Sequence, residues 1–399
     1  MLYLWLVDQK KTTENSVTHI VGNEISGDLK LTNGNDSYSL LIMHFLRAQS
    51  IAIAAMILVL FELQAHDTHP SRSEYQIPNQ PITIGEGAFR YQLVPGWAQH
   101  NSENYKIGDG KAIAEDADGR IYHLNGSADN CVIVLNKNGD VLDAWGDFAP
   151  GAHGLNLFKE AGRELLFISE NRANGKIFKT TLDGKILMTV SCPVESGLYP
   201  DPGMFRPAEV VPLTNGDFLA LDGYGSDYII RFNKEGEFLS AFGGKLGQGE
   251  AQLKHWGPHG ANVDYRDPED PVLIVGLSDQ EKIKRFTLSG THIDTIPLPG
   301  ANPRDIYFHR GHIFIPHLGD NWPKEPNNPG YISIVDYDFN VVANLGAYTA
   351  TYKNDHLERM HHNQHAFHHP HGILVAKDGS LYVVQDASNN SWPMKFRPL

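Results

Sequence analysis

Three histidines in this chain are each followed by glycine and recur at nearly equal intervals. They are His153, His259 and His371, with separations of 106 and 112 residues. Imidazole is the commonest metal ligand among side chains, and three imidazoles with one open position form the ligand set of catalytic zinc. Iron and manganese suit the same geometry, because ligand type alone does not select strictly between these ions. The spacing therefore predicts a three-histidine metal centre, provided that the fold repeats in phase with it.

The chain does repeat, with a period of about fifty residues. Each unit has an apolar strand, a turn containing Asp-Gly or Asn-Gly, and further short strands. Asn215-Gly216 and Glu235-Gly236 are the clearest predicted hairpin turns. The first strands of the six units begin near Ala112, His153, Ala208, His259, Arg304 and His371.

Six units of four short antiparallel strands predict an all-β fold, a six-bladed β-propeller. The last unit has three strands before Leu399, so residues 89–94 are expected to supply its fourth strand and close the ring. The first strand of each blade lines the channel of a propeller, which would bring the three histidines of blades two, four and six together at its axis. A pair of β-sandwiches or a β-helix is the alternative architecture.

On these residues the chain resembles the peptidyl-α-hydroxyglycine α-amidating lyases, six-bladed propellers built from NHL repeats. The resemblance covers about residues 89–399 and includes the three histidines and Asp222-Gly223-Tyr224. It implies a zinc-dependent enzyme that splits peptidyl-α-hydroxyglycine into a peptide amide and glyoxylate, with Tyr224 as a catalytic residue. A phenol beside a metal ion can accept the proton of the substrate hydroxyl. The alternative role of Tyr224 is that of an ordinary aromatic packed in a turn.

The chain departs from this family at the substrate-binding positions. The family's arginine in the first blade is missing from the segment around His123, and Gln280 stands in place of a second arginine. Arg206 and Arg304, at the heads of blades three and five, are the candidates to bind a substrate carboxylate instead. The family has an aspartate after its third histidine, associated with a structural calcium, whereas this chain has Gly372.

The missing arginines favour a second hypothesis, a non-catalytic propeller that serves as a binding or scaffold module. A repeat fold of this kind hosts many functions, so the fold alone does not decide between the two. A sugar-lactone hydrolase of similar architecture is a weaker third hypothesis, because such sites use carboxylate and asparagine ligands for a divalent ion.

Seven histidines lie between residues 356 and 371 and form a dense cluster before the third His-Gly pair. The cluster predicts a partly solvated loop over the channel mouth, with a second metal site or a proton relay as the alternative. Within it, His368 is expected to support the ligand His371 from behind. Asp201, Glu209 and Asp305 are further candidates to hydrogen-bond a ligand histidine, or else they cap turns.

The residues before the repeats are expected to lie outside the propeller. The apolar run from Ile51 to Phe61, behind Arg47, suits a secretory signal better than a membrane span. The protein is therefore predicted to be exported to the periplasm or the cell exterior, or else held at a membrane by this segment. The predicted organisation is a disordered or upstream extension over 1–42, a signal peptide or signal anchor over 43–65, a linker over 66–87 and the propeller over 88–399.

The charge balance limits the partners of the protein. The chain has 33 basic and 47 acidic residues, a formal charge of −14. Phosphate binding needs a basic face, so no nucleic acid is expected, and a membrane is expected only through residues 43–65. A small polar or peptide-derived substrate remains the predicted ligand. The two cysteines, Cys131 and Cys192, either pair in an oxidising compartment or stay as free thiols.

Overall fold

The computed structural model describes residues 75–254, 257–319, 322, 324–387 and 392–399. The extension predicted over 1–42 and the signal peptide or anchor predicted over 43–65 lie outside these residues. The described residues all belong to one compact unit. Among them, no helix has the length and apolar character needed to cross a membrane.

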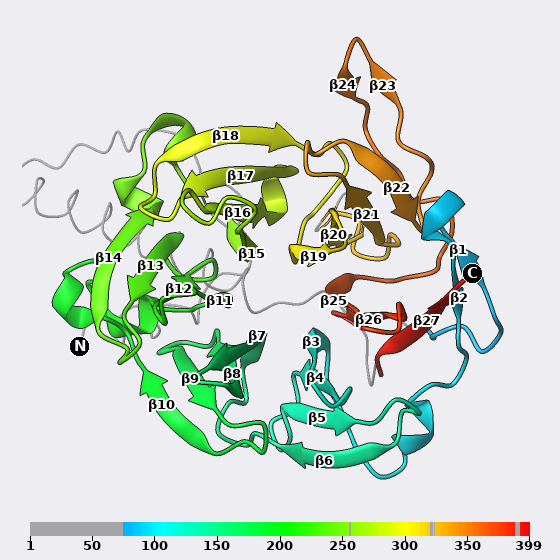
Figure 1. The fold of residues 1–399 in the computed structure, drawn as a ribbon, viewed down its shortest axis with the longest axis horizontal. Coiled ribbons are helices and arrows are strands. Elements are labelled where there is room, and N and C mark those ends of the chain that lie inside the picture. The colour runs from blue at the N-terminus through cyan, green and yellow to red at the C-terminus, as the bar shows by residue number, and fades with distance from the viewer. Residues whose placement is uncertain (1–74, 255–256, 320–321, 323, 388–391) are drawn as a thin grey trace, which may run out of the picture. The chain divides into compact units, whose positions relative to one another are not determined.

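Six antiparallel sheets are arranged in a ring, and each sheet is one blade (Figure 1). In blades one to five the first strand is innermost and the fourth is outermost, in the order of the chain, whereas in blade six the outer strands come from the N-terminal part of the chain. This arrangement confirms the all-β, six-bladed propeller. Blade one contains β3 (Gly110–Glu115), β4 (Ile121–Asn125), β5 (Val132–Leu135) and β6 (Val141–Trp145). Blade two contains β7 (Ala152–Glu160), β8 (Arg163–Glu170), β9 (Lys176–Thr180) and β10 (Ile186–Val190).

Blades three to five follow the same order, and blade six is completed by N-terminal strands. Blade three contains β11 (Glu209–Pro212), β12 (Phe218–Leu221), β13 (Tyr228–Phe232) and β14 (Phe238–Gly243). Blade four contains β15 (Pro258–Asp264), β16 (Val272–Leu277), β17 (Lys282–Thr287) and β18 (His292–Pro297). Blade five contains β19 (Tyr307–His309), β20 (His312–His317), β21 (Tyr331–Val335) and β22 (Val341–Leu345). Blade six contains β25 (Pro370–Val375), β26 (Leu381–Gln385) and β27 (Met394–Pro398), joined by β2 (Tyr91–Leu93) and β1 (Thr83–Ile84).

Turn glycines set the register of the blades. Gly216 and Gly236 have φ angles of 92° and 87°, which L side chains rarely adopt, and they connect β11 to β12 and β13 to β14. Both predicted hairpin turns are therefore confirmed. The helices of the described residues are single 3₁₀ turns in the connections: η2 (Gly87–Phe89), η3 (Gln99–Asn101), η4 (Val194–Ser196), η5 (Pro202–Met204), η6 (Gly244–Leu246), η7 (Gly249–Ala251) and η8 (Ser278–Gln280).

The hydrophobic core lies between neighbouring blades, and strand β12 shows why. Phe218 of this strand packs with Phe167 of blade two, whereas the next residue, Leu219, packs with Leu273 of blade four. Successive side chains of a strand point to opposite faces, so an uninterrupted apolar strand can fill both interfaces. Each blade is thereby held by its two neighbours, and the ring must close to bury the last face.

The two ends of the chain close the ring in blade six (Figure 1). Strand β2 pairs with β27 through Tyr91 opposite Pro398 and Leu93 opposite Phe396. This pairing confirms that an N-terminal strand completes the last blade, although the strand is shorter than the predicted 89–94. The described part of the segment expected as a linker, residues 75–87, packs against the propeller. Within it, β1 adds a fifth strand to blade six, and the Tyr75 hydroxyl donates to the carbonyl of Ala366 at 2.8 Å.

An insertion between blades five and six projects from the ring as a hairpin (Figure 1). It is formed by β23 (Tyr352–Lys353) and β24 (His356–Leu357). The histidine cluster thus begins on an exposed hairpin but ends in a buried segment, because His368 and His369 are at most 1 % exposed.

Candidate metal centre

The three predicted histidines converge at the centre of the ring. His153 lies in β7, His259 in β15 and His371 in β25, the innermost strands of blades two, four and six. Their candidate ligand atoms all lie within 4.8 Å of one another, and their ring centroids are 4.8 to 4.9 Å apart. The three side chains are buried. The two-blade spacing in the sequence therefore places them around the axis.

Each imidazole is oriented by a main-chain carbonyl of the next blade. The Nδ1 atoms of His153, His259 and His371 donate to the carbonyls of Ala208, Arg304 and Lys111, at 2.9, 2.9 and 2.7 Å. A carbonyl oxygen can only accept, so each Nδ1 carries the proton and each Nε2 keeps a lone pair. This is the tautomer that a metal ion requires of an imidazole bound through Nε2.

The glycine after each histidine makes these contacts possible. A Cβ atom at Gly154 would lie 2.6 Å from the Ala208 carbonyl oxygen. At Gly260 it would lie 2.3 Å from the Arg304 oxygen, and at Gly372 it would lie 2.8 Å from the Lys111 oxygen. Real Cβ atoms essentially never approach so closely. The repeated His-Gly pair therefore codes both for the ligand and for the close approach of its orienting carbonyl.

Tyr224 lies over two of the imidazoles. Its hydroxyl oxygen is 3.0 Å from His153 Nε2 and 3.2 Å from His259 Nε2. The turn that carries it follows β12, and a Cβ atom at Gly223 would lie only 2.1 Å from the carbonyl oxygen of Pro258. Because a phenol has one hydrogen, it can donate to only one of the two nitrogens at a time. The Tyr224 hydroxyl therefore lies next to any ion or molecule that these two nitrogens would bind.

Burial keeps the histidines neutral. Desolvation is the largest cause that lowers the pKa of His153 and His259 well below the usual value, and it lowers the pKa of His371 to about 3. The neutral imidazole is the form that binds a metal ion. Burial also raises the pKa of the Tyr224 phenol, opposed by the nearby charges of Arg304 and Lys111.

The donor set fits a transition-metal ion such as zinc. It consists of three neutral imidazole nitrogens, and His371 Nε2 is buried with no hydrogen-bond partner among the described residues. A buried polar atom without a partner is costly, and a metal ion would satisfy it. The three-histidine site is thus a candidate metal centre, and its donors do not identify the ion.

Charged side chains surround the three imidazoles. Lys111 Nζ lies 2.5 Å from Asp386 Oδ1, and each of the two side chains is 10 % exposed. Burial opposes the charge of Lys111, yet Asp386 and Asp109 together raise its pKa. Arg304 is 5 % exposed, and its Nε has no hydrogen-bond partner among the described residues. A buried guanidinium with a free donor has capacity for an anionic ligand group.

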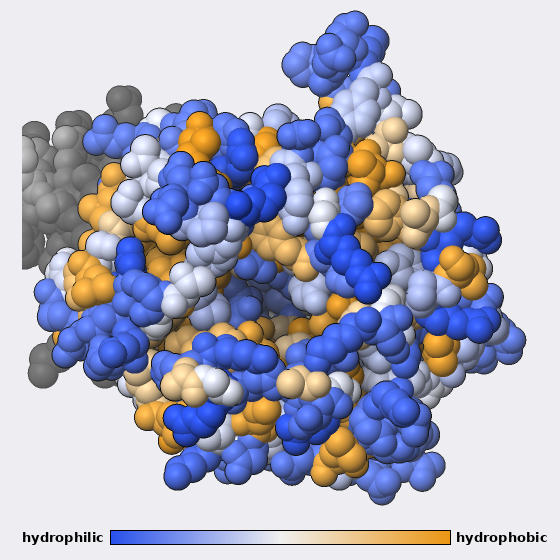
Figure 2. Space-filling model, in the orientation of Figure 1, coloured by the Kyte–Doolittle hydropathy of each residue, from blue (hydrophilic) through white to orange (hydrophobic). Residues whose placement is uncertain are grey.

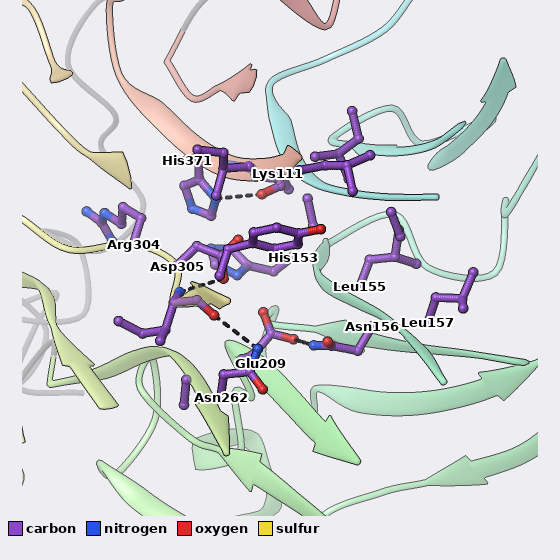
Figure 3. Close-up of a pocket in the computed structure, with 18 of the residues that line it drawn as sticks. Lys111, His153, Leu155, Asn156, Leu157, Glu209, Asn262, Arg304, Asp305 and His371 are labelled. Carbon is purple, nitrogen blue, oxygen red and sulfur yellow. Dashed lines mark hydrogen bonds between the residues drawn. The ribbon is translucent and has the colours of Figure 1, made fainter. Parts of the chain in front are cut away.

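A cavity of about 320 Å³ extends from the histidines along the channel and is lined by residues of all six inner strands. Figure 2 shows a hollow with hydrophilic side chains at the centre of the ring. Glu209 and Asp305 line this cavity with the histidines (Figure 3). Burial and then Asp305 raise the pKa of Glu209 to about 8, and burial raises that of Asp305 to about 6.

The other residues singled out in the sequence lie elsewhere or have other partners. Arg206 does not line the cavity, and its Nε donates to the carbonyl of Asn171 at 2.8 Å. His368 stacks on Tyr75, with a centroid distance of 5.7 Å. The main-chain carbonyl of Lys111, and not His368, accepts the hydrogen bond from His371 Nδ1.

None of the three candidate carboxylates orients a ligand histidine, because carbonyls do so. Asp201 caps η5 instead, where its Oδ1 accepts from the Gly203 nitrogen at 2.8 Å. Glu209 accepts from Asn156 Nδ2 at 2.7 Å (Figure 3), and Asp305 accepts from the main-chain nitrogen of Ile306, also at 2.7 Å. Cys131 and Cys192 are both free thiols in the structure, which resolves the pairing left open by the sequence.

The sequence prediction missed two parts of the site. The orienting carbonyls leave no side-chain signature, although the repeated glycine after each histidine is a signal of their close approach. The ion pair between Lys111 and Asp386 joins residues 275 positions apart, and neither belongs to a motif. Only the ring closure brings blades one and six together.

Comparison with solved structures supports the fold. A streptogramin B lyase matches with a TM-score of 0.50 and 16 % identity over 74 % of this chain and 95 % of that chain. A catalytically inactive virginiamycin B lyase from Staphylococcus aureus, solved with quinupristin, matches with a TM-score of 0.48 and 16 % identity, over 82 % and 97 % of the two chains. No protein-family model and no curated protein sequence matches the chain. At this identity the likeness to the streptogramin B lyase shows the β-propeller fold alone, and a lyase is among the proteins that use it.

Proposed function

We propose that this protein is a metal-dependent lyase that cleaves the carbon–nitrogen bond of an α-hydroxyamide. The observation that carries the proposal is the convergence of three neutral imidazole nitrogens, two of which contact the Tyr224 hydroxyl, at 3.0 Å from His153 and 3.2 Å from His259. The His-Gly pairs and Asp222-Gly223-Tyr224, on which the sequence resembles the peptidyl-α-hydroxyglycine amidating lyases, suggest the reaction.

Zinc is the proposed ion, held by His153, His259 and His371, and iron or manganese are the alternatives. When bound, it would supply Lewis acidity that lowers the pKa of a nearby hydroxyl. The carbonyls of Ala208 and Lys111 would keep two of the imidazoles in the ligand tautomer during turnover. No calcium is included, since Gly372 replaces the carboxylate expected for it.

Tyr224 would act as the general base, because the charge of the bound ion would offset the burial that raises the pKa of its phenol. As phenolate, its oxygen takes the proton from the substrate hydroxyl, the carbonyl double bond forms, and the bond between that carbon and the amide nitrogen breaks. The electron pair of the broken bond goes to the nitrogen, which takes the proton back from Tyr224. The products are a primary amide and an aldehyde, which is glyoxylate when the substrate is a hydroxyglycine. Atoms and electrons balance without an oxidant.

Arg304 is the proposed partner of the substrate carboxylate. It is buried, it lines the same cavity as the histidines, and its Nε is free to donate to an anion. Arg206 is not among the residues that line the cavity. Its Nε donates to the carbonyl of Asn171, and its own carbonyl accepts from the nitrogen of Tyr224. This assignment would restore the charge that the missing family arginines supply.

Export through the segment 43–65 remains part of the proposal, and a substrate outside the cytoplasm follows from it.

The test is glyoxylate release from a short α-hydroxyglycine peptide by the zinc-loaded full chain. The Tyr224→Phe variant should lose at least about 100-fold in kcat, because a positioned general base contributes about 10²–10⁴-fold. Tyr348→Phe is the matched control, since Tyr348 is 64 % exposed on the inserted segment. Bound zinc without turnover of any hydroxyglycine peptide would reject this reaction and favour the binding-module hypothesis instead.

A further inference from the structure

A carboxylate that is not among the cavity-lining residues, that of Asp222, is buried two residues before Tyr224. Asp222 has no exposed surface, and its two oxygens accept three hydrogen bonds. Oδ1 accepts from the main-chain nitrogen of Arg206 at 2.6 Å, and Oδ2 accepts from the Tyr199 hydroxyl at 2.7 Å and the Ser226 nitrogen at 2.8 Å. These donors come from two segments, so one side chain connects the turn after β12 to the chain that precedes β11.

The turn that carries Tyr224 wraps around this carboxylate. The main-chain oxygen of Asp222 accepts from the nitrogens of Gly225 and Asp227, at 3.1 and 3.0 Å. The nitrogen of Tyr224 itself donates to the carbonyl of Arg206 at 3.3 Å. A Cβ atom at Gly225 would lie 2.2 Å from Asp222 Oδ1, so the chain passes against the carboxylate with no room for a side chain.

The position of the phenol depends on this turn. Its oxygen must stay within hydrogen-bond distance of two nitrogens at once, His153 Nε2 and His259 Nε2. Displacement of a reacting group by about 1 Å can cost about 10²-fold in rate. A tyrosine at the tip of a turn is held by the main chain of that turn, and Asp222 supplies its buried acceptors.

We infer that Asp222 is a positioning residue for the proposed reaction: its carboxylate fixes the turn 222–228 and thereby places the Tyr224 oxygen over the imidazoles. The inference depends on the proposed function for its effect on the reaction rate. Its structural part, the placement of the phenol, is independent of that reaction. Asp222 is not among the residues that line the cavity.

Asp222→Asn is the informative variant, because it preserves the shape of the side chain. Whichever way the amide is turned, its NH₂ group faces a donor, so at least one hydrogen bond is lost and two donors oppose each other. We expect kcat to fall about 10–100-fold, with KM and zinc content changed by less than about twofold. Tyr199→Phe removes only one of the three hydrogen bonds and should lower kcat by a few fold.

Asp116 provides a matched control in blade one. It is 1 % exposed, accepts from the Tyr122 hydroxyl at 3.1 Å, and accepts from the main-chain nitrogens of Asp118 and Arg120 at 3.0 and 2.8 Å. Asp116→Asn should therefore lower the melting temperature as Asp222→Asn does, but leave kcat unchanged. If Asp222→Asn lowers kcat no more than Asp116→Asn does, the inference is overturned.

A second measurement needs neither metal nor activity. The near-ultraviolet circular dichroism of the Tyr224 ring is isolated as the difference between each protein and its Tyr224→Phe counterpart. A ring held in one orientation over the imidazoles gives a distinct band in the wild type, and this band should weaken in Asp222→Asn. An unchanged band would contradict the inference even if the wild type released no glyoxylate, and Tyr199→Phe gives the same readout if Asp222→Asn does not fold.

Discussion

The Gly260→Ala substitution tests how the histidines are oriented. Its Cβ atom would lie 2.3 Å from the Arg304 carbonyl oxygen, whereas ordinary van der Waals contact begins at 3.4 Å. The carbonyl must therefore retreat by about 1 Å, which lengthens the 2.9 Å bond from His259 Nδ1 beyond hydrogen-bonding range. The imidazole of His259 then loses the partner that fixes its tautomer.

The expected cost follows from that lost contact. Removing the partner that orients a ligand histidine costs about 10–100-fold in metal affinity, or about 1.4–2.7 kcal/mol. Competition between the protein and a chromophoric chelator for zinc measures this change. Gly126→Ala is the matched control, because its φ is ordinary and its Cβ atom would meet nothing closer than 3.6 Å. Equal zinc affinity in both variants and the wild type would refute the role assigned to the glycines.

Three further predictions concern buried charges. Burial raises the pKa of Glu209 to about 8, so the folded state resists ionisation of this side chain and its stability falls as the pH rises from about 4.5 toward 8. In thermal unfolding, Glu209→Gln should flatten this fall, whereas Glu235→Gln, at an exposed position, should not. Burial lowers the pKa of His123 to about 3, and neither ring nitrogen has a hydrogen-bond partner among the described residues. The stability of the fold should therefore fall as the pH drops from about 6.5 toward 3, and His123→Leu should reduce the loss of stability at pH ~4.5. Asp386→Asn should cost about 3 kcal/mol by leaving the Lys111 ammonium unpaired, and adding Lys111→Met should recover part of it in denaturant unfolding; additive costs would argue against the ion pair.

The sequence predicted the fold and the centre of the site well, for a physical reason. In a propeller, the number of repeats in the closed ring fixes the angle between blades, so inner-strand residues at the same phase of alternate units meet at the axis. His153, His259 and His371 satisfy that condition in the sequence and converge in the structure. Turn glycines such as Gly216 were equally predictable, because their φ angles exclude most other residues.

The parts that escaped prediction depend on contacts between blades. A carbonyl such as that of Ala208 has no residue type, so only the geometry reveals that it orients His153. The pairing of Lys111 with Asp386 requires the ring to be closed before the two residues meet. Arg304 and Arg206 are both basic residues at blade heads, and only their surroundings distinguish the cavity-lining Arg304 from Arg206, which donates to Asn171.

The metal content of the purified full chain tests the central claim most directly. Elemental analysis after refolding with zinc, iron or manganese should find one tightly bound ion per chain. His153→Ala, His259→Ala and His371→Ala should each abolish tight binding, whereas exposed His356→Ala on the projecting hairpin should retain it. A wild-type chain that binds none of these ions, or single variants that bind as well as the wild type, would contradict the three-histidine metal centre.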